Sequence, residues 1–122
     1  MNGADETVMP DGGTWTLKFN FRDGYVATSP VGRFRASPFG LHDMLGNVWE
    51  WCNDWYDDYP QGAVQDPQGP SEGSLRVDRG GCWYYEAAVC RSAYRSGIIP
   101  SGRGNFIGFR LALSSPESPS KV

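Results

Sequence analysis

The segment Phe39–Tyr56, FGLHDMLGNVWEWCNDWY, constrains the fold more than any other part of this 122-residue chain. Three of the five tryptophans, Trp49, Trp51 and Trp55, fall within it and alternate with polar residues. Burying one large aromatic side chain removes about 150–250 Å² from water, and an alternation with a period of two is typical of a half-buried strand. We therefore expect Val48 to Trp55 to form a strand that anchors the core.

Turn-forming residues limit the other elements to short lengths. The chain holds 16 glycines and 9 prolines, yet 14% of its residues are aromatic. This composition predicts a loop-rich α+β domain with short antiparallel strands and one or two short helices. Hydrophobic patterns predict further strands at Thr14–Phe19, Leu75–Trp83 and Phe106–Leu113, and helical turns at Asp43–Leu45 and Ala87–Tyr94.

The length of the chain predicts one domain. A mass of 13.5 kDa suffices for a single core, which we place in residues 1–113, followed by a disordered polar tail at 114–122. Proline, glycine and acidic residues make Tyr56–Gly73 a surface loop. Ser96–Asn105 has no hydrophobic period, and we expect it to be a loop as well.

Charge and hydropathy exclude several classes of protein. A net charge of -3, a pI near 5.0 and only two lysines argue against a nucleic-acid groove. No apolar run approaches the roughly 20 residues of a membrane helix, and the sequence MNGADETVMP lacks the features of a signal peptide. These patterns predict neither membrane insertion nor secretion, and fit a cytoplasmic protein.

The cysteines and the one histidine restrict the chemistry further. Cys52, Cys82 and Cys90 are odd in number, so at most one disulfide can form and one thiol is left over. A reduced, cytosolic state is the simpler expectation. His42 is the only histidine, which excludes metal sites built from several histidines and requires any Ser-His-Asp triad to use this residue.

Several motifs together resemble a known family. They are, in chain order, GYVATSPVGRF, FGLHDMLGNVWEWCNDWY, RVDRGGCW, CRSAYR and GFRLAL. Between about Asp23 and Leu113 they resemble the C-terminal half of the formylglycine-generating-enzyme (sulfatase-modifying factor) family, which has a C-type-lectin-like fold. Because the family domain is about twice this length, the resemblance implies a C-terminal portion or a minimal version of it.

The resemblance does not settle the activity, because the family includes enzymes and non-enzymes. Its oxidases carry a cysteine pair between a GGSW-like strand and the later CR element, whereas Tyr84–Val89 contains no cysteine. Cys90 resembles a structural cysteine of those enzymes, and Cys82 stands where the family has serine. A Cu(I) site needs two well-placed thiolates, so we expect no enzyme. An oxidase, an iron-dependent sulfoxide synthase and a structural accessory domain remain as alternatives.

A second resemblance is to the variable proteins of diversity-generating retroelements, which share this fold and vary in the same C-terminal stretch. Adenine mutagenesis of AAC or AAT codons yields no Glu, Lys, Gln, Met or Trp. The residues at the matching positions are all permitted products, although Glu86 between them is not. They are Tyr84, Tyr85, Ala88, Val89, Tyr94, Ser96, Gly97, Ile98, Ile99, Ser101, Gly102, Gly104, Asn105 and Phe106.

This second resemblance implies a phage or bacterial protein that binds a protein or another cell-surface ligand. Tyrosine, isoleucine and phenylalanine mixed with serine, glycine and asparagine are typical of binding loops. Ile98 and Ile99 in a loop would otherwise be unexplained exposed apolar area. The alternative is that this stretch is an irregular part of the core, since most apolar residues are buried for packing.

The family resemblance also implies structural calcium, which takes six to eight oxygen ligands. The residues carried over to a first site are Asp43 and Glu50 through side chains and Gly46 and Val48 through carbonyl groups. The residues of a second, weaker site are Asn2, Gly3, Asp23 and Tyr25.

The acidic residues of the first site have an alternative that needs no metal. Glu50 could pair with an arginine such as Arg79 or Arg110, and Asp43 could cap its own turn through Gly46. Both alternatives stay open at the level of the sequence.

Overall fold

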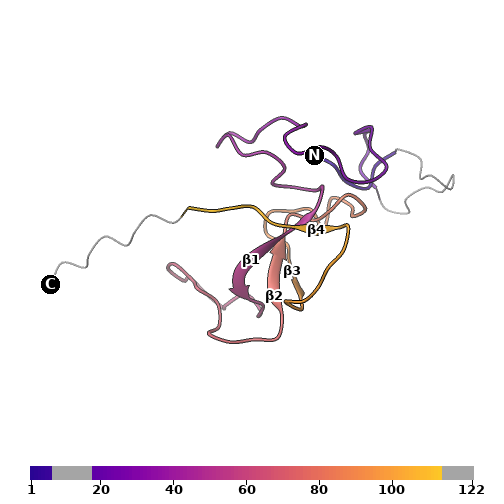
Figure 1. The fold of residues 1–122 in the computed structure, drawn as a ribbon. Coiled ribbons are helices and arrows are strands. Elements are labelled where there is room, and N and C mark those ends of the chain that lie inside the picture. The colour runs from indigo at the N-terminus through magenta and orange to yellow at the C-terminus, as the bar shows by residue number, and fades with distance from the viewer. Residues whose placement is uncertain (7–17, 114–122) are drawn as a thin grey trace.

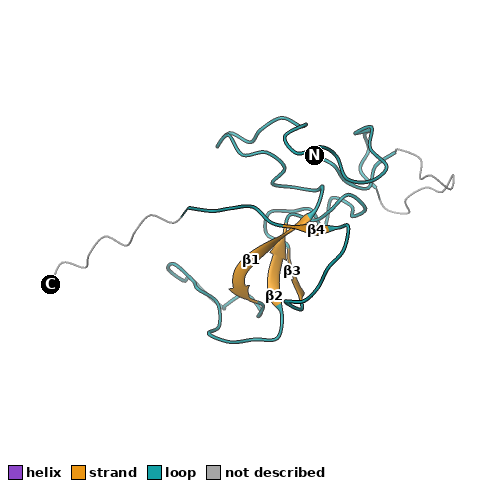
Figure 2. Ribbon diagram, viewed as in Figure 1, coloured by secondary structure: helices purple, strands orange, loops and turns teal. Residues whose placement is uncertain are grey.

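The computed structural model describes residues 1–6 and 18–113, in which all regular structure belongs to one four-stranded sheet (Figure 1, Figure 2). The strands are β1 (Trp49–Trp55), β2 (Arg76–Arg79), β3 (Arg95–Ile98) and β4 (Ile107–Gly108). Their order in the sheet is β3-β2-β1-β4. The long aromatic strand β1 is therefore central, as its alternation predicts.

The two inner strands of the sheet, β1 and β2, are hydrogen-bonded neighbours. β1 runs antiparallel to β2, with Trp51 opposite Asp78, and its pairing is irregular between Trp51 and Trp55. β2 runs antiparallel to β3, with Val77 opposite Gly97. β4 is parallel to β1, with Trp49 opposite Ile107.

The predicted strands are confirmed in part. Leu75–Trp83 contains β2, but Phe106–Leu113 forms a strand only over the two residues of β4. The sequence did not predict β3, because Ser96–Asn105 was expected to be a loop. Most of the predicted strand Thr14–Phe19, and the predicted tail at 114–122, lie outside the described residues.

The predicted helices are wrong within the described residues, which contain strands, turns and loops only. Asp43, Gly46 and Asn47 have φ angles of 53°, 77° and 68°, which belong to the left-handed region and cannot continue a right-handed helix. In Ala87–Tyr94 the backbone makes only isolated turns. The α+β class is thereby corrected to short strands joined by long loops.

The core lies where the N-terminal residues meet the sheet. Trp49 is 4% exposed, and Val77 and Ala4 are also buried, whereas Trp51 and Trp55 are half-buried. Residues 56–73 are exposed apart from Pro70, which confirms the predicted surface loop. One tryptophan rather than three therefore fills the centre.

Loops at 18–47 lie at one end of the sheet, at the top of Figure 1. Asn2 forms an isolated parallel bridge with Gly46, and the Asn47 N–H donates to the Asn2 carbonyl at 2.7 Å. The Gly46 N–H donates to the Gly80 carbonyl at 2.7 Å. The first residues of the chain are thus bonded to the segment that leads into β1, and this segment is bonded to the residue that follows β2. In the described part of the chain no helix could cross a membrane.

Candidate functional site

Two distant stretches of the predicted binding face lie side by side. The Trp83 indole Nε1–H donates to the Asn105 carbonyl at 3.2 Å, and the rings of Tyr84 and Phe106 meet edge to face with centroids 6.1 Å apart. The loop after β2 and the loop before β4 therefore form one surface.

Aromatic rings connect this surface to the core. The ring centroids of Tyr84 lie 4.9 Å from Trp83 and 4.8 Å from Tyr85, and Tyr85 packs on buried Trp49 at 5.7 Å. Tyr94 also packs on Trp49, with ring centroids 6.0 Å apart. Tyr85 and Tyr94 are consequently shared between the binding face and the core, and their replacement would cost stability as well as contact area.

Burial also changes the acidity of the tyrosines. Desolvation raises the pKa of Tyr84 to about 12 and raises the pKa of Tyr85 above its usual value. Both hydroxyl groups therefore stay protonated at neutral pH and can donate hydrogen bonds.

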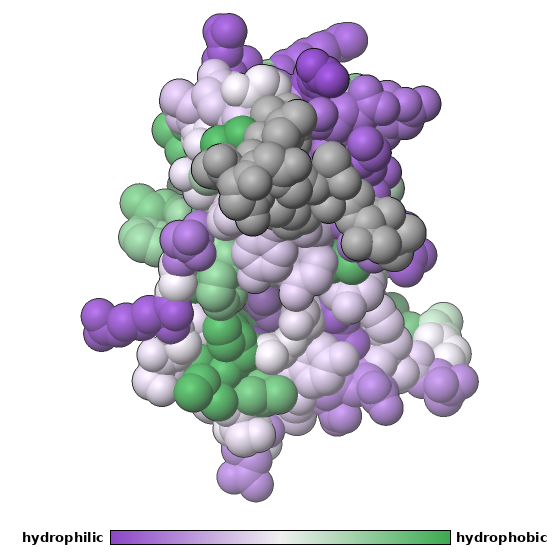
Figure 3. Space-filling view, turned by 90° about the vertical axis from the view of Figure 1, so that its right-hand side faces the viewer, coloured by the Kyte–Doolittle hydropathy of each residue, from purple (hydrophilic) through white to green (hydrophobic). Residues whose placement is uncertain are grey.

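The predicted face divides by exposure. Ile99 is 54% exposed, and the other exposed members are Ala88, Ser101, Gly104 and Asn105. The half-buried members are Tyr84, Tyr85, Val89, Tyr94, Ser96, Gly97, Ile98, Gly102 and Phe106. The exposed members thus include the apolar side chains of Ala88 and Ile99 and the polar ones of Ser101 and Asn105. On the one side of the molecule that Figure 3 draws, hydrophobic and hydrophilic residues are likewise mixed.

Three glycines of the face have no room for a side chain. A Cβ added at Gly97 would lie 2.8 Å from the Tyr56 ring, and one at Gly102 would lie 2.7 Å from the Ile98 side chain. A Cβ at Gly104 would lie 2.7 Å from Cδ1 of the Phe106 ring and closer still to its Cε1. Real Cβ atoms do not approach so closely, so larger residues at these positions require their neighbours to move.

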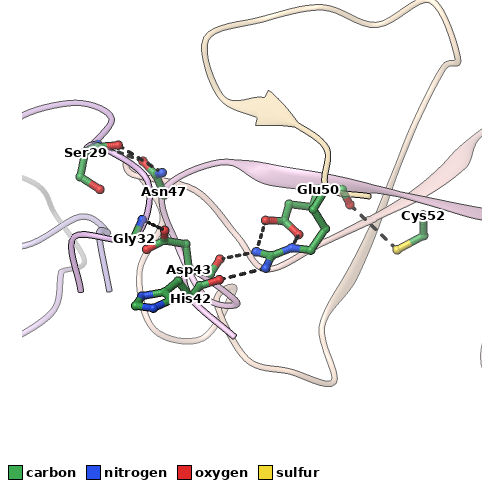
Figure 4. A network of polar contacts seen from close by, with 8 residues as sticks. Ser29, Gly32, His42, Asp43, Asn47, Glu50 and Cys52 are labelled. Atoms are coloured by element: carbon green, nitrogen blue, oxygen red, sulfur yellow. Dashed lines mark hydrogen bonds and ion pairs between the residues drawn. The ribbon is translucent and has the colours of Figure 1, made fainter. Parts of the chain in front are cut away.

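The first predicted calcium set holds an ion pair. Both carboxylate oxygens of Glu50 accept hydrogen bonds from the Arg110 guanidinium, which also donates to the His42 carbonyl at 2.9 Å and the Asp43 carbonyl at 3.2 Å (Figure 4). It is the single ion pair found among residues 1–6 and 18–113. Of the two arginines considered for Glu50, Arg110 is therefore its partner.

Asp43 makes a different contact from the one expected. Its Oδ2 accepts a hydrogen bond from the Gly32 N–H at 2.7 Å, and not from its own turn, while its Oδ1 is buried without a partner. Asp43, Val48 and Glu50 line a hollow of ≈ 290 Å³. A free carboxylate oxygen in a hollow suits a hard cation, but Glu50 is already held by Arg110, so this set fits calcium only in part.

The residues predicted for the second calcium site are linked by more contacts than those of the first. Asp23 accepts hydrogen bonds from the N–H groups of Gly3 at 3.1 Å and Tyr25 at 2.8 Å, and the Oδ1 of buried Asn2 has no partner. The buried carboxylate of Asp5 accepts a hydrogen bond from the Asp23 N–H. No sequence pattern pointed to Asp5, because it lies in a segment without periodicity.

The two carboxylates of this second set crowd one another. Burial raises the pKa of Asp23, and the nearby charge of Asp5 raises it further. A bound cation would relieve this repulsion. Neither set brings together three His, Cys, Asp or Glu side chains, and no such group occurs elsewhere in the described residues. Carbonyl and amide oxygens would thus have to supply most ligands.

The sequence of this chain matches a known family of protein domains. Residues 2–115 match the family described as "Sulfatase-modifying factor enzyme 1-like domain". Among curated proteins, the formylglycine-generating enzyme of Streptomyces coelicolor is 40% identical over 95 residues, which cover 74% of this chain and 30% of that enzyme. The serine/threonine-protein kinase pkn1 of Chlamydia caviae is 45% identical over 89 residues, or 70% of this chain and 14% of that protein.

Two solved structures are similar in fold. Treponema denticola variable protein 1 is 41% identical with a TM-score of 0.64, over 68% of this chain and 31% of that one. PvdO from Pseudomonas aeruginosa is 39% identical with a TM-score of 0.67, over 76% of this chain and 36% of that one. The chain therefore spans about a third or less of the length of these relatives.

Proposed function

We propose, from the premise that this chain belongs to the family of sulfatase-modifying factor enzyme 1-like domains, that it is a ligand-binding variable protein of a diversity-generating retroelement. One observation carries the proposal. The segments at 84–89 and 96–106 converge through Tyr84 and Phe106 on one surface that Trp49 anchors. The similarity to Treponema denticola variable protein 1 supports it. As its fold we propose a C-type-lectin-like arrangement of the strands and loops.

The chemistry of this face favours a protein or another cell-surface ligand. Rigid aromatic rings supply contact area at low entropic cost, and small polar residues such as Ser101 and Asn105 adapt to the partner. Ile99, at 54% exposure, adds an apolar contact at the rim. Binding would bury these side chains while Trp49 stays in place.

Diversifying the exposed positions tests the proposal. We expect a library at Ala88, Ile99, Ser101 and Asn105 to keep its unfolding midpoint in most members, because exposed substitutions change stability by about 0.5 kcal/mol or less. Selection of this library on bacterial surface proteins should then enrich binders. The matched control is a library at Gly97, Gly102 and Gly104, in which most members should be destabilised.

Two results would count against the binding face. The first is an exposed-position library in which most members unfold, which would make the loops part of the core. The second is a stable library from which no selection enriches a binder, which would favour an accessory domain without a ligand.

Calcium is proposed as a structural ion of this domain. The second set is the better supported one, because Asn2 Oδ1 is buried without a partner, the Asp5 carboxylate accepts from the Asp23 N–H, and the charge of Asp5 raises the pKa of the Asp23 carboxyl. At the first set, Asp43 Oδ1 would supply the free oxygen. A bound ion would stiffen the loops on which the aromatic face rests.

An oxidase is the second candidate, favoured by the 40% identity to the formylglycine-generating enzyme of Streptomyces coelicolor. Thiolates are the ligands that Cu(I) prefers, but burial raises the pKa of Cys82 and of Cys90 to about 11 each, which opposes thiolate formation. Incubation in air, which supplies O2 as the oxidant, with Cu(I) and a cysteine-containing peptide tests the candidate. We expect no formylglycine in the peptide, and its appearance would establish the oxidase instead.

A further inference from the structure

Two buried thiols flank the first loop of the binding face. Cys82 is 0% exposed and Cys90 is 2% exposed. Cys82 follows β2 after two glycines, and Cys90 closes a turn in which its N–H donates to the Glu86 carbonyl at 3.3 Å. The third cysteine, Cys52, is half-buried on β1.

The packing around Gly81 brings Cys90 against the residue that precedes Cys82. Gly81 has a φ of 73°, and a Cβ added to it would lie 3.0 Å from the Cα and 3.2 Å from the Cβ of Cys90, and closer still to its sulfur. The missing side chain of Gly81 is therefore what gives Cys90 its place beside the backbone at Cys82.

The polar surroundings of the sulfurs agree with this packing. The charge of Cys90 raises the pKa of the Cys82 thiol, and the backbone N–H of Cys82 lowers the pKa of the Cys90 thiol, so the two groups lie close together. Cys90 Sγ also faces the Tyr85 carbonyl at 3.7 Å. The charged neighbours of Cys52 are instead Arg79, Asp54, Asp78 and Glu50. Of the three cysteines, Cys82 and Cys90 are thus the adjacent pair.

We propose that Cys82 and Cys90 form a disulfide under oxidising conditions and that Cys52 stays a free thiol. Each of the two thiols loses its hydrogen, and one S–S bond forms between them. The two electrons and two protons pass to a disulfide oxidant such as oxidised glutathione, whose own S–S bond breaks to give two thiols. The proposal depends on the thiols alone and stands or falls independently of any ligand.

The bond would close a loop that carries part of the binding face. Tyr84, Tyr85, Ala88 and Val89 lie between the two cysteines, so the crosslink would hold these residues in one arrangement before a ligand arrives. Closing a loop restricts the unfolded chain and raises the unfolding midpoint. Because burial raises the pKa of both thiols to about 11, exchange should be slow in the folded protein and faster when the chain refolds in the oxidant.

Peptide mapping of the full chain tests the pairing directly. The protein is refolded in either oxidised glutathione or a reducing phosphine, unfolded, alkylated with iodoacetamide and digested with trypsin. Cleavage after Arg79 and Arg91 leaves both cysteines in the single peptide Gly80–Arg91. We expect this peptide to carry two alkyl groups from the reduced sample, and none from the oxidised sample, in which it should be lighter than the dithiol by two hydrogen atoms.

Two variants separate the pair from the third cysteine. Cys52→Ser should still form the bond and show a higher unfolding midpoint in oxidant than in reductant. Cys82→Ser should form no internal bond, and its midpoint should not respond to oxidant. The proposal is overturned if Gly80–Arg91 stays doubly alkylated after refolding in oxidant, or if Cys52 is found crosslinked to either partner. The Cys52→Ser result decides the matter even if Cys82→Ser fails to fold.

Discussion

A single carboxylate in β2 illustrates how much burial matters at the scale of the residue. Asp78 is 3% exposed, and its Oδ1 has no hydrogen-bond partner. Burial raises its pKa to about 6, although the Ser96 hydroxyl stabilises the charged form. The folded protein therefore binds the Asp78 proton more tightly than the unfolded chain, whose carboxyl has the ordinary value near 3.8.

Because the pKa of Asp78 is higher in the folded protein than in the unfolded chain, the stability of the fold should decrease as the pH rises. The contribution of Asp78 to stability is most favourable below the unfolded pKa of 3.8 and is lost as the pH rises through about 6. Asp78→Asn should then stabilise the protein by about 1–3 kcal/mol at pH 7 and by little at pH 4, measured by urea unfolding at both values. Asp58→Asn, on the exposed loop, is the control and should show no such pH-dependent gain.

Arg110 is expected to matter for a different reason. Its guanidinium joins Glu50 to the carbonyls of His42 and Asp43, so Arg110→Gln leaves a partly buried carboxylate without its cation. We expect a loss of about 1–3 kcal/mol in the free energy of unfolding. Arg33→Gln, an exposed change nearby in the loops, should cost little. Equal losses in the two variants would show that the bridge is not structural.

Residue pairs were predictable only where the sequence restricted the partners. For Glu50 in the aromatic strand, a carboxylate that needs a cation, Arg79 and Arg110 were the two partners considered, and Arg110 is the one that pairs with it. Asp5 and the pair Cys82–Cys90 gave no such signal, because their burial depends on how loops distant in sequence pack together. The contact of Asp43 with Gly32 was missed for the same reason.

At the scale of elements, the bridge between Asn2 and Gly46 holds the N-terminal loops on the sheet. A Cβ at Gly46 would lie 2.8 Å from the Asn2 carbonyl carbon and closer to its oxygen, whereas Gly40, with nearly the same φ, has nothing within 4 Å of such a Cβ. An added side chain would therefore meet the same unfavourable φ at both glycines, but a steric clash only at Gly46.

Gly46→Ala and Gly40→Ala together separate the two effects. Both substitutions should cost about 1 kcal/mol from the positive φ, and Gly46→Ala should cost at least about 2 kcal/mol more because the bridge must open. Denaturant unfolding of both variants measures the difference. Losses of the same size would mean that the bridge contributes little.

Strands were predictable where side chains alternate and unpredictable where tertiary contacts decide. Val48–Trp55 alternates and forms β1. β3, with the sequence RSGI, does not alternate. It is a strand because it pairs with β2 and because Gly97 leaves room for the Tyr56 ring. The predicted helix at Ala87–Tyr94 failed since its turns close locally around buried Cys90 instead of extending.

At the scale of the whole molecule, structural calcium makes stability depend on chelator. An ion present at 100 times its dissociation constant stabilises the folded state by about 2.7 kcal/mol, so we expect excess EDTA to lower the unfolding midpoint by about 5 °C or more. Asp23→Asn should abolish this response if the second set holds the ion, and Asp43→Asn if the first does. Asp58→Asn should retain it. A midpoint that EDTA leaves unchanged would contradict the proposal.

The central claim is that exposed positions in the segments 84–89 and 96–106 vary on a constant aromatic frame, and sequencing the DNA beside this gene tests it most directly. The account predicts a near-copy of the codons for residues Gly80–Arg110 that differs from the gene at adenines, next to a reverse transcriptase gene. In that copy the codons for Ala88, Ile99, Ser101 and Asn105 should be AAC or AAT. Flanking DNA without such a copy would contradict the claim and favour the enzyme or the accessory domain.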